Sequence, residues 1–242
     1  MTQQHSVALV SHGTSSPLGR TAVAALVDAV GRRLGDRRVV SGFVDVQQPD
    51  LPSTLAGGRG SIVVPLLLSA GYHVHVDMRE AVHADASPSV LAAALGPDDR
   101  LVDVLARRLR EAGLTESDGS DDDVVVLAAA GSSDARAVAD CRDMASRLGS
   151  ALGREVTCAF ISAATPRLTD AVSAARRRHP SSRVVVATYL LASGYFADLA
   201  AACGADVVTG PLLSAQGVVP EELVDVVVDR CLVAESEALI AS

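Results

Sequence analysis

Short apolar segments alternate with longer amphipathic segments along the chain, which is the pattern of repeated strand–helix units. In the first half this pattern predicts strands at Val7–Ser11, Val39–Val46, Ser61–Leu68 and Val90–Ala94. It predicts helices at Gly19–Leu34, Leu51–Leu55, Asp77–Ala84 and Asp98–Ala112. The third strand segment is almost continuously apolar, so we expect both of its faces to be buried in a parallel sheet. The pattern therefore indicates an α/β protein.

The same order of segments returns in the second half, together with the residues themselves. Four blocks recur in order: Val7–Ser15 as Val125–Ser133, Phe43–Leu51 as Phe160–Leu168, Leu67–Tyr72 as Leu190–Tyr195, and Gly96-Pro97 as Gly210-Pro211. Four coincidences in one order indicate an internal duplication. The acidic, glycine-containing stretch Thr115–Asp123 between the halves is typical of a linker. We therefore expect two similar domains at residues 1–116 and 124–242, joined by an acidic linker at residues 117–123.

Polar residues at three predicted strand ends of the first half have no counterpart in the second half. His12 aligns with Ala130, Asp45 with Ser162, and His73 with Phe196. His12 follows the first strand, Asp45 lies near the end of the second, and His73 lies in the predicted loop after the third. The carboxyl ends of parallel strands form the binding crevice of open α/β sheets. We therefore expect the chemistry of the protein to reside in the first half.

These residue types suit metal binding or acid–base catalysis. Two imidazoles and a carboxylate bind divalent cations such as Fe²⁺, Co²⁺, Ni²⁺ or Zn²⁺, and an imidazole also serves as a base near neutral pH. His75 and Asp77 follow His73 closely, so either is an alternative to it. A strand-end histidine is also common as a capping or surface residue, but three coordinated differences favour a functional site. The other histidines, His5, His83 and His179, are expected to be exposed to solvent.

Composition excludes several classes of function. The chain of 242 residues has a net charge of −8 and only 2% aromatic residues, which argues against nucleic-acid or anionic-membrane binding. No apolar run approaches the length of a membrane span, and the N-terminus lacks the pattern of an export signal. A cytoplasmic protein is therefore expected. The cysteines lie far apart in apolar contexts, which predicts buried thiols rather than disulfides or a zinc site.

Two further classes lack their required residues. The sequence Ser11-His12-Gly13-Thr14-Ser15 after a strand resembles a phosphate-binding loop, because small residues expose backbone N–H groups at a helix N-terminus. No lysine follows it, however, and neither GxxxxGK[ST] nor GxGxxG occurs there. A GxSxG motif is also absent, which disfavours a serine hydrolase. The run Arg176-Arg177-Arg178-His179 is interpreted as a solvated helix end favoured by the helix dipole.

Three blocks of the first half resemble the sirohydrochlorin chelatases. They are Ser-His-Gly-Thr at residues 11–14, Phe-Val-Asp-Val-Gln-Gln-Pro-Asp-Leu at residues 43–51, and Val-Pro-Leu-Leu-Leu-Ser-Ala-Gly-Tyr-His-Val-His-Val-Asp at residues 64–77. These enzymes are class II chelatases, which insert a divalent metal into a tetrapyrrole without ATP. The second half follows the same plan but lacks counterparts of His12 and His73, as in the long, internally duplicated members of the family. The resemblance implies two tandem chelatase-like domains of Rossmann or flavodoxin type, each a small parallel sheet flanked by helices.

The resemblance also implies roles for individual residues. His12 and His73 would bind the metal and accept protons, and Asp45 would take the place of the glutamate in the family's Phe-x-Glu motif, with a reach one methylene shorter. The residues implied in substrate binding are Ser11, Gly13, Thr14, Gly71, Tyr72 and His75. Arg20 and Arg79 are further candidates for contacts to the substrate's carboxylates.

The family implies Fe²⁺ for sirohaem or Co²⁺ for cobalamin as the inserted metal. No site for an organic cofactor is evident in the sequence, and the tandem architecture predicts a monomer whose halves pair about a pseudo-twofold axis. An alternative from another class is a non-catalytic carrier of divalent metal or tetrapyrrole, which would use the same histidines. A pair of regulatory or nucleotide-binding domains is disfavoured by the missing phosphate-loop chemistry.

Overall fold

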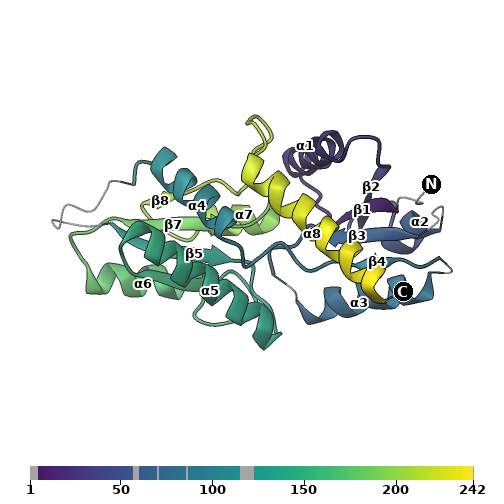
Figure 1. Cartoon of the computed structure of the whole chain (residues 1–242). Coiled ribbons are helices and arrows are strands. Elements are labelled where there is room, and N and C mark those ends of the chain that lie inside the picture. The colour runs from purple at the N-terminus through teal and green to yellow at the C-terminus, as the bar shows by residue number, and fades with distance from the viewer. Residues whose placement is uncertain (1–4, 57–59, 70, 86, 115–122, 242) are drawn as a thin grey trace.

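Two parallel sheets of four strands each form the framework of the protein (Figure 1). The computed structural model describes residues 5–56, 60–69, 71–85, 87–114 and 123–241, without the side chains of residues 72–75 and 241. The first sheet consists of β1 (Ser6–Ser11), β2 (Val39–Phe43), β3 (Ser61–Pro65) and β4 (Val90–Leu91). The second consists of β5 (Val124–Ala129), β6 (Val156–Phe160), β7 (Val184–Tyr189) and β8 (Val207–Val208).

The strand orders β2-β1-β3-β4 and β6-β5-β7-β8 are the same, and the paired strands are parallel in both sheets. The helices are α1 (Pro17–Leu34), α2 (Leu51–Leu55), α3 (Tyr72–Ala84), α4 (Asp99–Glu111), α5 (Ala135–Leu152), α6 (Leu168–Arg178), α7 (Tyr195–Ala201) and α8 (Glu221–Ala241). The predicted fold, two duplicated α/β units with helices flanking parallel sheets, is confirmed.

Local sequence explains how α1 is set against the first sheet. The helix begins after Ser16, whose hydroxyl accepts a hydrogen bond from the N–H of Gly19, and Pro17 occupies the first helical position. Both features are favoured at helix N-termini. Ala22, Leu26 and Val30 recur every four residues and are buried. This stripe anchors the helix that follows the first strand.

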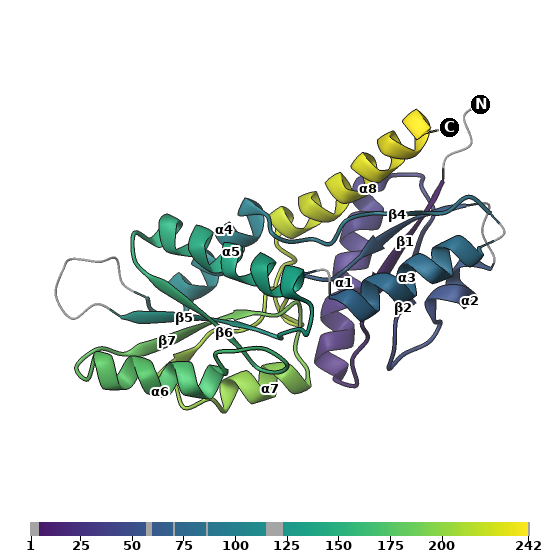
Figure 2. The same cartoon turned by 90° about the horizontal axis from the view of Figure 1, so that it is seen from below.

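The last helix of each half packs on the other half. Helix α4 packs against α5 and β7, whereas α8 packs against α1, β3 and β4. Figure 1 shows α8 (yellow) running across from the second half to the first, and Figure 2 shows it from below beside α1 and β4. The two halves therefore exchange their C-terminal helices within one chain.

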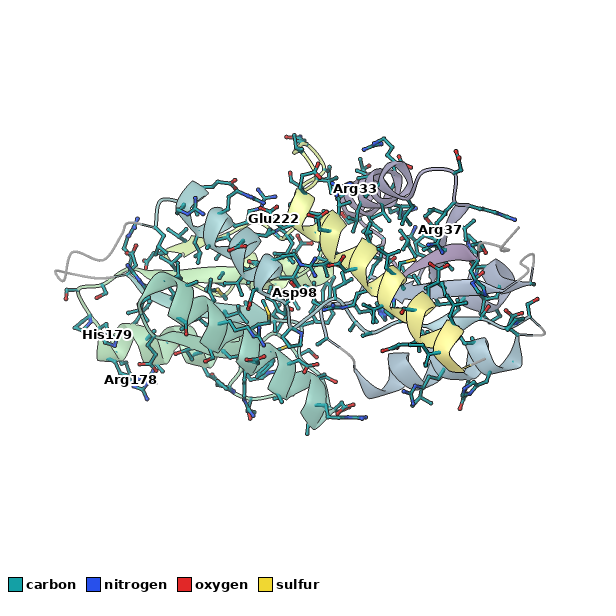
Figure 3. The ribbon with its side chains drawn as sticks, in the orientation of Figure 1. Arg33, Arg37, Asp98, Arg178, His179 and Glu222 are labelled. Carbon is teal, nitrogen blue, oxygen red and sulfur yellow. The ribbon has the colours of Figure 1, made fainter. Side chains whose placement is uncertain are left out.

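Ion pairs link α8 to residues of the first half, and several of these residues are labelled in Figure 3. Arg107 on α4 lies 2.7 Å from Glu222 on α8, and Arg37 lies 2.9 Å from Glu235. Arg33 on α1 pairs with Asp225 at 2.6 Å and also with Glu221. One hydrophobic core cluster contains residues from both halves, among them Leu26 and Leu127. The halves are thus joined by a shared core as well as by charge.

Some boundaries differ from the predictions. Helix α3 begins at Tyr72 and not at Asp77, so His73 lies in the first turn of a helix rather than in a loop. The alternating sequence of residues 72–76, with its β-branched valines, disfavours a helix locally, but Met78 and Val82 are buried on this helix and fix its position. Strand β2 ends at Phe43 and not at Val46. The Val44 N–H still donates to the Ser11 carbonyl, but the chain turns at Val46, whose φ is 61°, and returns so that the Phe43 N–H donates to the Pro49 carbonyl.

Three other predictions concern single features. Of the predicted linker at residues 117–123, residues 117–122 lie outside the described residues, whereas Asp123 is buried and pairs with Arg183 at 2.7 Å. All four cysteines are free, and Cys141, Cys203 and Cys231 are buried as expected, whereas Cys158 is half-buried. Among the described residues, no helix combines the length and the apolar character that a membrane crossing requires.

Candidate functional site

A cleft of about 630 Å³ lies between the two halves, at the carboxyl ends of their central strands. Its walls are formed by matching segments of the two halves, Ser11–Ser15 with Ala129–Ser133 and Leu66–Ser69 with Tyr189–Ala192, extended by residues 193–197. This volume lies within the range of small-molecule sites. A second hollow of about 480 Å³ lies beside α5 and β6 and is lined by Arg142, Arg154 and Cys158 among others. It lies away from the strand ends that meet between the halves.

The loops that carry the cleft are built in the same way in both halves. Gly13 and Gly131 have φ values of 92° and 94°, a conformation that favours glycine. A Cβ atom at either position would overlap the backbone carbonyl of Asp45 or Ser162, respectively. These tight turns bring the loop after β1 against the loop after β2 in the first half, and the loop after β5 against the loop after β6 in the second.

His12 lines the cleft with an exposed side chain at the end of β1. The backbone N–H of Asp45 donates to the His12 carbonyl at 3.2 Å, so the two residues lie side by side. The Asp45 carboxylate accepts a hydrogen bond from the Val46 N–H at 2.7 Å and remains exposed. Asp45 itself lies beside the cleft lining, to which the next residues, Val46 and Gln47, belong.

His73 lies at the same edge of the sheet, in the first turn of α3 after β3. The side chains of Tyr72, His73 and His75 lie outside the part of the chain that the structure describes. Among the side chains that the structure describes, no three histidines, cysteines, aspartates or glutamates gather as a metal site. Asp77, the alternative to His73, is exposed on α3.

Gln47 is a site residue that the sequence analysis missed. Its Oε1 accepts a hydrogen bond from the Thr14 N–H at 2.9 Å, and the Thr14 hydroxyl in turn accepts from the Ser16 N–H at 3.1 Å. Gln47 thereby ties the loop after β2 to the loop that carries His12. The residue at the matching place in the second half is Ala164. The comparison of halves that singled out Asp45 would have found Gln47 too.

Predicted substrate-binding residues lie where the halves touch. A Cβ atom at Gly194 would lie 2.9 Å from the Thr14 hydroxyl, and one at Gly71 would lie 3.5 Å from the Ser132 hydroxyl. Thr14 and Ser132 occupy matching places, as do Gly71 and Gly194, so these two contacts are related by the pseudo-twofold arrangement. Ser11 lines the cleft as well but is only 5% exposed.

Two titratable side chains at the floor of the cleft are held neutral. Burial raises the pKa of Tyr189 well above its usual value, and the hydroxyl donates to the Leu68 carbonyl at 3.0 Å across the junction. Burial also raises the pKa of the Cys141 thiol to about 11. Neither group therefore contributes charge to the cleft at neutral pH.

The remaining charged candidates lie at the surface. Arg20 is exposed, and its guanidinium donates to the Ser15 carbonyl at 3.0 Å, which places it at the rim of the cleft. Arg79 is exposed on α3. His83 and His179 are exposed as predicted, and Figure 3 shows His179 beside Arg178, far from α8. The prediction for His5 is wrong, because its ring is only 25% exposed and lies 3.9 Å from Glu235.

Comparisons with known sequences support the resemblance drawn from the motifs. A sirohydrochlorin ferrochelatase of Priestia megaterium is 28% identical over 199 residues, which cover 78% of this chain and 73% of that protein. A sirohydrochlorin cobaltochelatase of Methanosarcina acetivorans is 26% identical over 129 residues, which cover 46% of this chain and 99% of that protein. The shorter relative thus matches about one half of the duplicated chain.

Solved structures show the same fold. The structure of SirB from Bacillus subtilis with Fe³⁺ superimposes with a TM-score of 0.77 at 18% identity, over 97% of this chain and 98% of that one. A SirB structure in complex with cobalt gives a TM-score of 0.72 at 17% identity, with the same coverage. The profile of the family described as CbiX matches residues 6–112 and 124–199, in both halves of the duplication. The chain belongs to the CbiX family.

Proposed function

We propose that this protein is a sirohydrochlorin chelatase, which inserts Fe²⁺ or Co²⁺ into the tetrapyrrole without ATP. The observation that carries the proposal is the cleft between the duplicated halves, with His12 on its wall and Asp45 hydrogen-bonded to the His12 backbone. Membership of the CbiX family supports it, since relatives in both metal classes carry the chelatase name. The cleft has the size and place of a small-molecule site in an α/β protein.

The proposed chemistry is an exchange of protons for metal. Two N–H protons leave the inner nitrogens of the macrocycle as M²⁺ enters, so a base must accept them near neutral pH. His12 and His73 are assigned this task and the transient binding of the metal, because a neutral imidazole does both. Asp45 assists with a carboxylate oxygen. An incomplete ligand set holds the metal weakly, which allows its transfer to the ring nitrogens.

The substrate would lie against small and polar residues of the cleft. We assign Ser11, Gly13 and Thr14 to this surface because they form the loop between β1 and α1 that lines the cleft. Gly71, Tyr72 and His75 are assigned to it from their place at the start of α3. Arg20 and Arg79 are the cations assigned to the substrate's carboxylates, and of the two Arg20 lies at the rim.

The decisive experiment is multiple-turnover metallation of sirohydrochlorin, followed anaerobically by absorbance with Fe²⁺ and Co²⁺ supplied separately. We expect conversion above the uncatalysed rate, and the ratio of the two rates identifies the preferred metal. The double variant His12→Ala, His73→Ala is expected to lose about 10²- to 10⁴-fold in kcat, the usual contribution of general acid–base groups.

His83→Ala is the matched control, because His83 lies on the same helix as His73 but is exposed in the last turn. It is expected to retain the parent rate. A folded double variant that metallates as fast as the parent would refute the assignment of the histidines. A carrier of metal or tetrapyrrole would give at most one product per protein, so the number of turnovers separates the two functions.

A cytoplasmic monomer is part of the proposal. The pseudo-twofold pairing of halves within one chain supplies the two-walled cleft that a single-domain relative would build by forming a dimer. Sedimentation at micromolar concentration is expected to give a single species of the chain mass, 24.8 kDa. A stable dimer would contradict this part of the proposal alone.

A further inference from the structure

A chain with few aromatic side chains gathers three of them in one cleft. The sequence contains three Phe, three Tyr and no Trp, and Tyr189, Tyr195 and Phe196 all line the cleft between the halves. Tyr189 is buried, whereas Tyr195 and Phe196 are 71% and 38% exposed. Exposed apolar surface that gathers at a concave site marks a place where a ligand binds.

The two exposed rings form a defined surface. Their centroids lie 5.9 Å apart, with an angle of 59° between the ring planes, an arrangement that aromatic pairs favour. Both belong to the first turn of α7, and Leu199, one turn after Tyr195, is also 39% exposed. We name the side chains of Tyr195 and Phe196 the aromatic wall.

The aromatic wall occupies the place that carries His73 in the first half. Gly194-Tyr195-Phe196 at the start of α7 matches Gly71-Tyr72-His73 at the start of α3. Both segments follow the third strand of their own sheet, so both approach the cleft from the same structural position. Phe196 therefore replaces a ligand-capable histidine by a flat apolar ring.

The part of the second half that the structure describes places no charged or imidazole side chain on the cleft. Among the described lining residues of this half, none is His, Asp, Glu, Lys or Arg. The polar groups there are backbone atoms, the buried hydroxyl of Tyr189, the buried thiol of Cys141 and the hydroxyls of Ser132, Ser133, Ser162, Ser193 and Tyr195. The two walls of the cleft thus differ in chemistry, since His12 lies on one and exposed aromatic rings lie on the other.

We propose that Tyr195 and Phe196 pack against a face of the tetrapyrrole macrocycle, one ring flat and the other edge-on, so that the second half holds the macrocycle while the first half handles metal and protons. This inference rests on the proposed function. A planar conjugated ring gains dispersion and stacking energy on aromatic side chains without any requirement for charge. The aromatic wall also offers no imidazole or carboxylate that would compete with the ring nitrogens for the metal after it leaves the histidines.

The test is the binding of metal-free sirohydrochlorin, titrated anaerobically and followed by its absorbance. Phe196→Ala and Tyr195→Ala are each expected to raise the Kd about tenfold, the loss of one aromatic contact. Phe196→Tyr retains the ring and is expected to recover most of the affinity. Leu239→Ala is the matched control, because Leu239 is equally exposed at 71% but lies near the end of α8, and it is expected to bind as the parent does.

Turnover supplies a second measurement. The alanine variants are expected to raise the KM for sirohydrochlorin and to keep kcat, since a surface that only holds the ring contributes uniform binding. If the parent binds and metallates sirohydrochlorin and the alanine variants bind it equally tightly, the role of the aromatic wall is refuted. The proposed function then remains intact. An equal loss in Leu239→Ala would also refute it, because the effect would not be local. A parent that neither binds nor metallates would overturn both.

Discussion

Gly19 of α1 lies directly against the backbone of the second half, which makes it a sharp test of the domain junction. A Cβ atom at Gly19 would overlap the carbonyl oxygen of Ser193 and would lie 2.9 Å from the Thr14 Cγ2 atom. The overlapping oxygen is a backbone atom of the second half, so the rotation of a side chain does not relieve the overlap. Gly19→Ala must therefore push the halves apart, by a distance on the order of 1 Å.

Two opposing free energies decide the outcome of Gly19→Ala. Alanine in place of glycine in a helix interior is favourable by up to about 1 kcal/mol, and less in the first turn, where Gly19 lies. Overpacking of a close junction costs about 1–3 kcal/mol. We expect the overlap to dominate, with a net loss of about 1–2 kcal/mol in the free energy of unfolding. This loss corresponds to a decrease in Tm of about 2–8 °C for a chain of this size.

Gly31→Ala is the control within the same helix. A Cβ atom at Gly31 would lie 4.0 Å from the nearest atoms of Val39, which is an ordinary contact. Only the helix propensity then changes, and we expect a gain of about 0.5–1 kcal/mol. Urea unfolding and thermal melting of the two variants should therefore shift in opposite directions from the parent.

The junction also borders the cleft, so Gly19→Ala is expected to raise the KM for the substrate, whereas Gly31→Ala is not. The reasoning is wrong if Gly19→Ala is as stable as Gly31→Ala, or if both leave the KM unchanged. The first outcome would mean that the halves shift without cost, and the second would mean that their spacing does not define the cleft.

Three further predictions test other contacts. The hydrogen bond from Arg107 lowers the pKa of Glu222, so this pair stabilises the fold above the ordinary carboxyl pKa and the stabilisation is lost as the pH falls through the lower folded pKa. Glu222→Gln should lose about 0.5–1 kcal/mol at pH 7, and urea midpoints should show the difference shrinking below about pH 4; a constant difference would contradict the assignment. Tyr189→Phe removes the donor to the Leu68 carbonyl and should lower stability by about 1 kcal/mol in the same assay; an unchanged midpoint would show that the bond contributes nothing. Burial raises the pKa of Cys141 to about 11, so its alkylation at pH 8, followed by mass spectrometry, should be at least about 100-fold slower in the native than in the unfolded protein; equal rates would refute its burial.

Much of the architecture follows from local pattern. The sequence predicts the positions of the strands because buried parallel strands need continuous apolar runs. It shows the duplication because repeated turns need the same glycines. Gly13 and Gly131 illustrate this, since both take a positive φ at matching places. The position of His12 at a cleft follows in the same way, from its place after a strand.

Other features depend on contacts that no local pattern contains. The start of α3 at Tyr72 contradicts the local preference of its first residues, because the packing of Met78 and Val82 decides where the helix lies. The role of Gln47 depends on a hydrogen bond to Thr14, across a loop that approaches only in the folded chain. The difference between Gln47 and Ala164 is visible in the sequence, but the contact that gives it meaning is not.

The sequence by itself determined the α/β class, the duplication, the family resemblance and the asymmetry of His12, Asp45 and His73 between the halves. Only the tertiary structure decided that α4 and α8 exchange places and that the cleft is built from both halves. The physical reason is that an amphipathic pattern states which face of a helix must be buried, but not which sheet buries it. That choice was settled by the shared core and by charge pairs such as Arg107–Glu222, whose members lie far apart in the sequence.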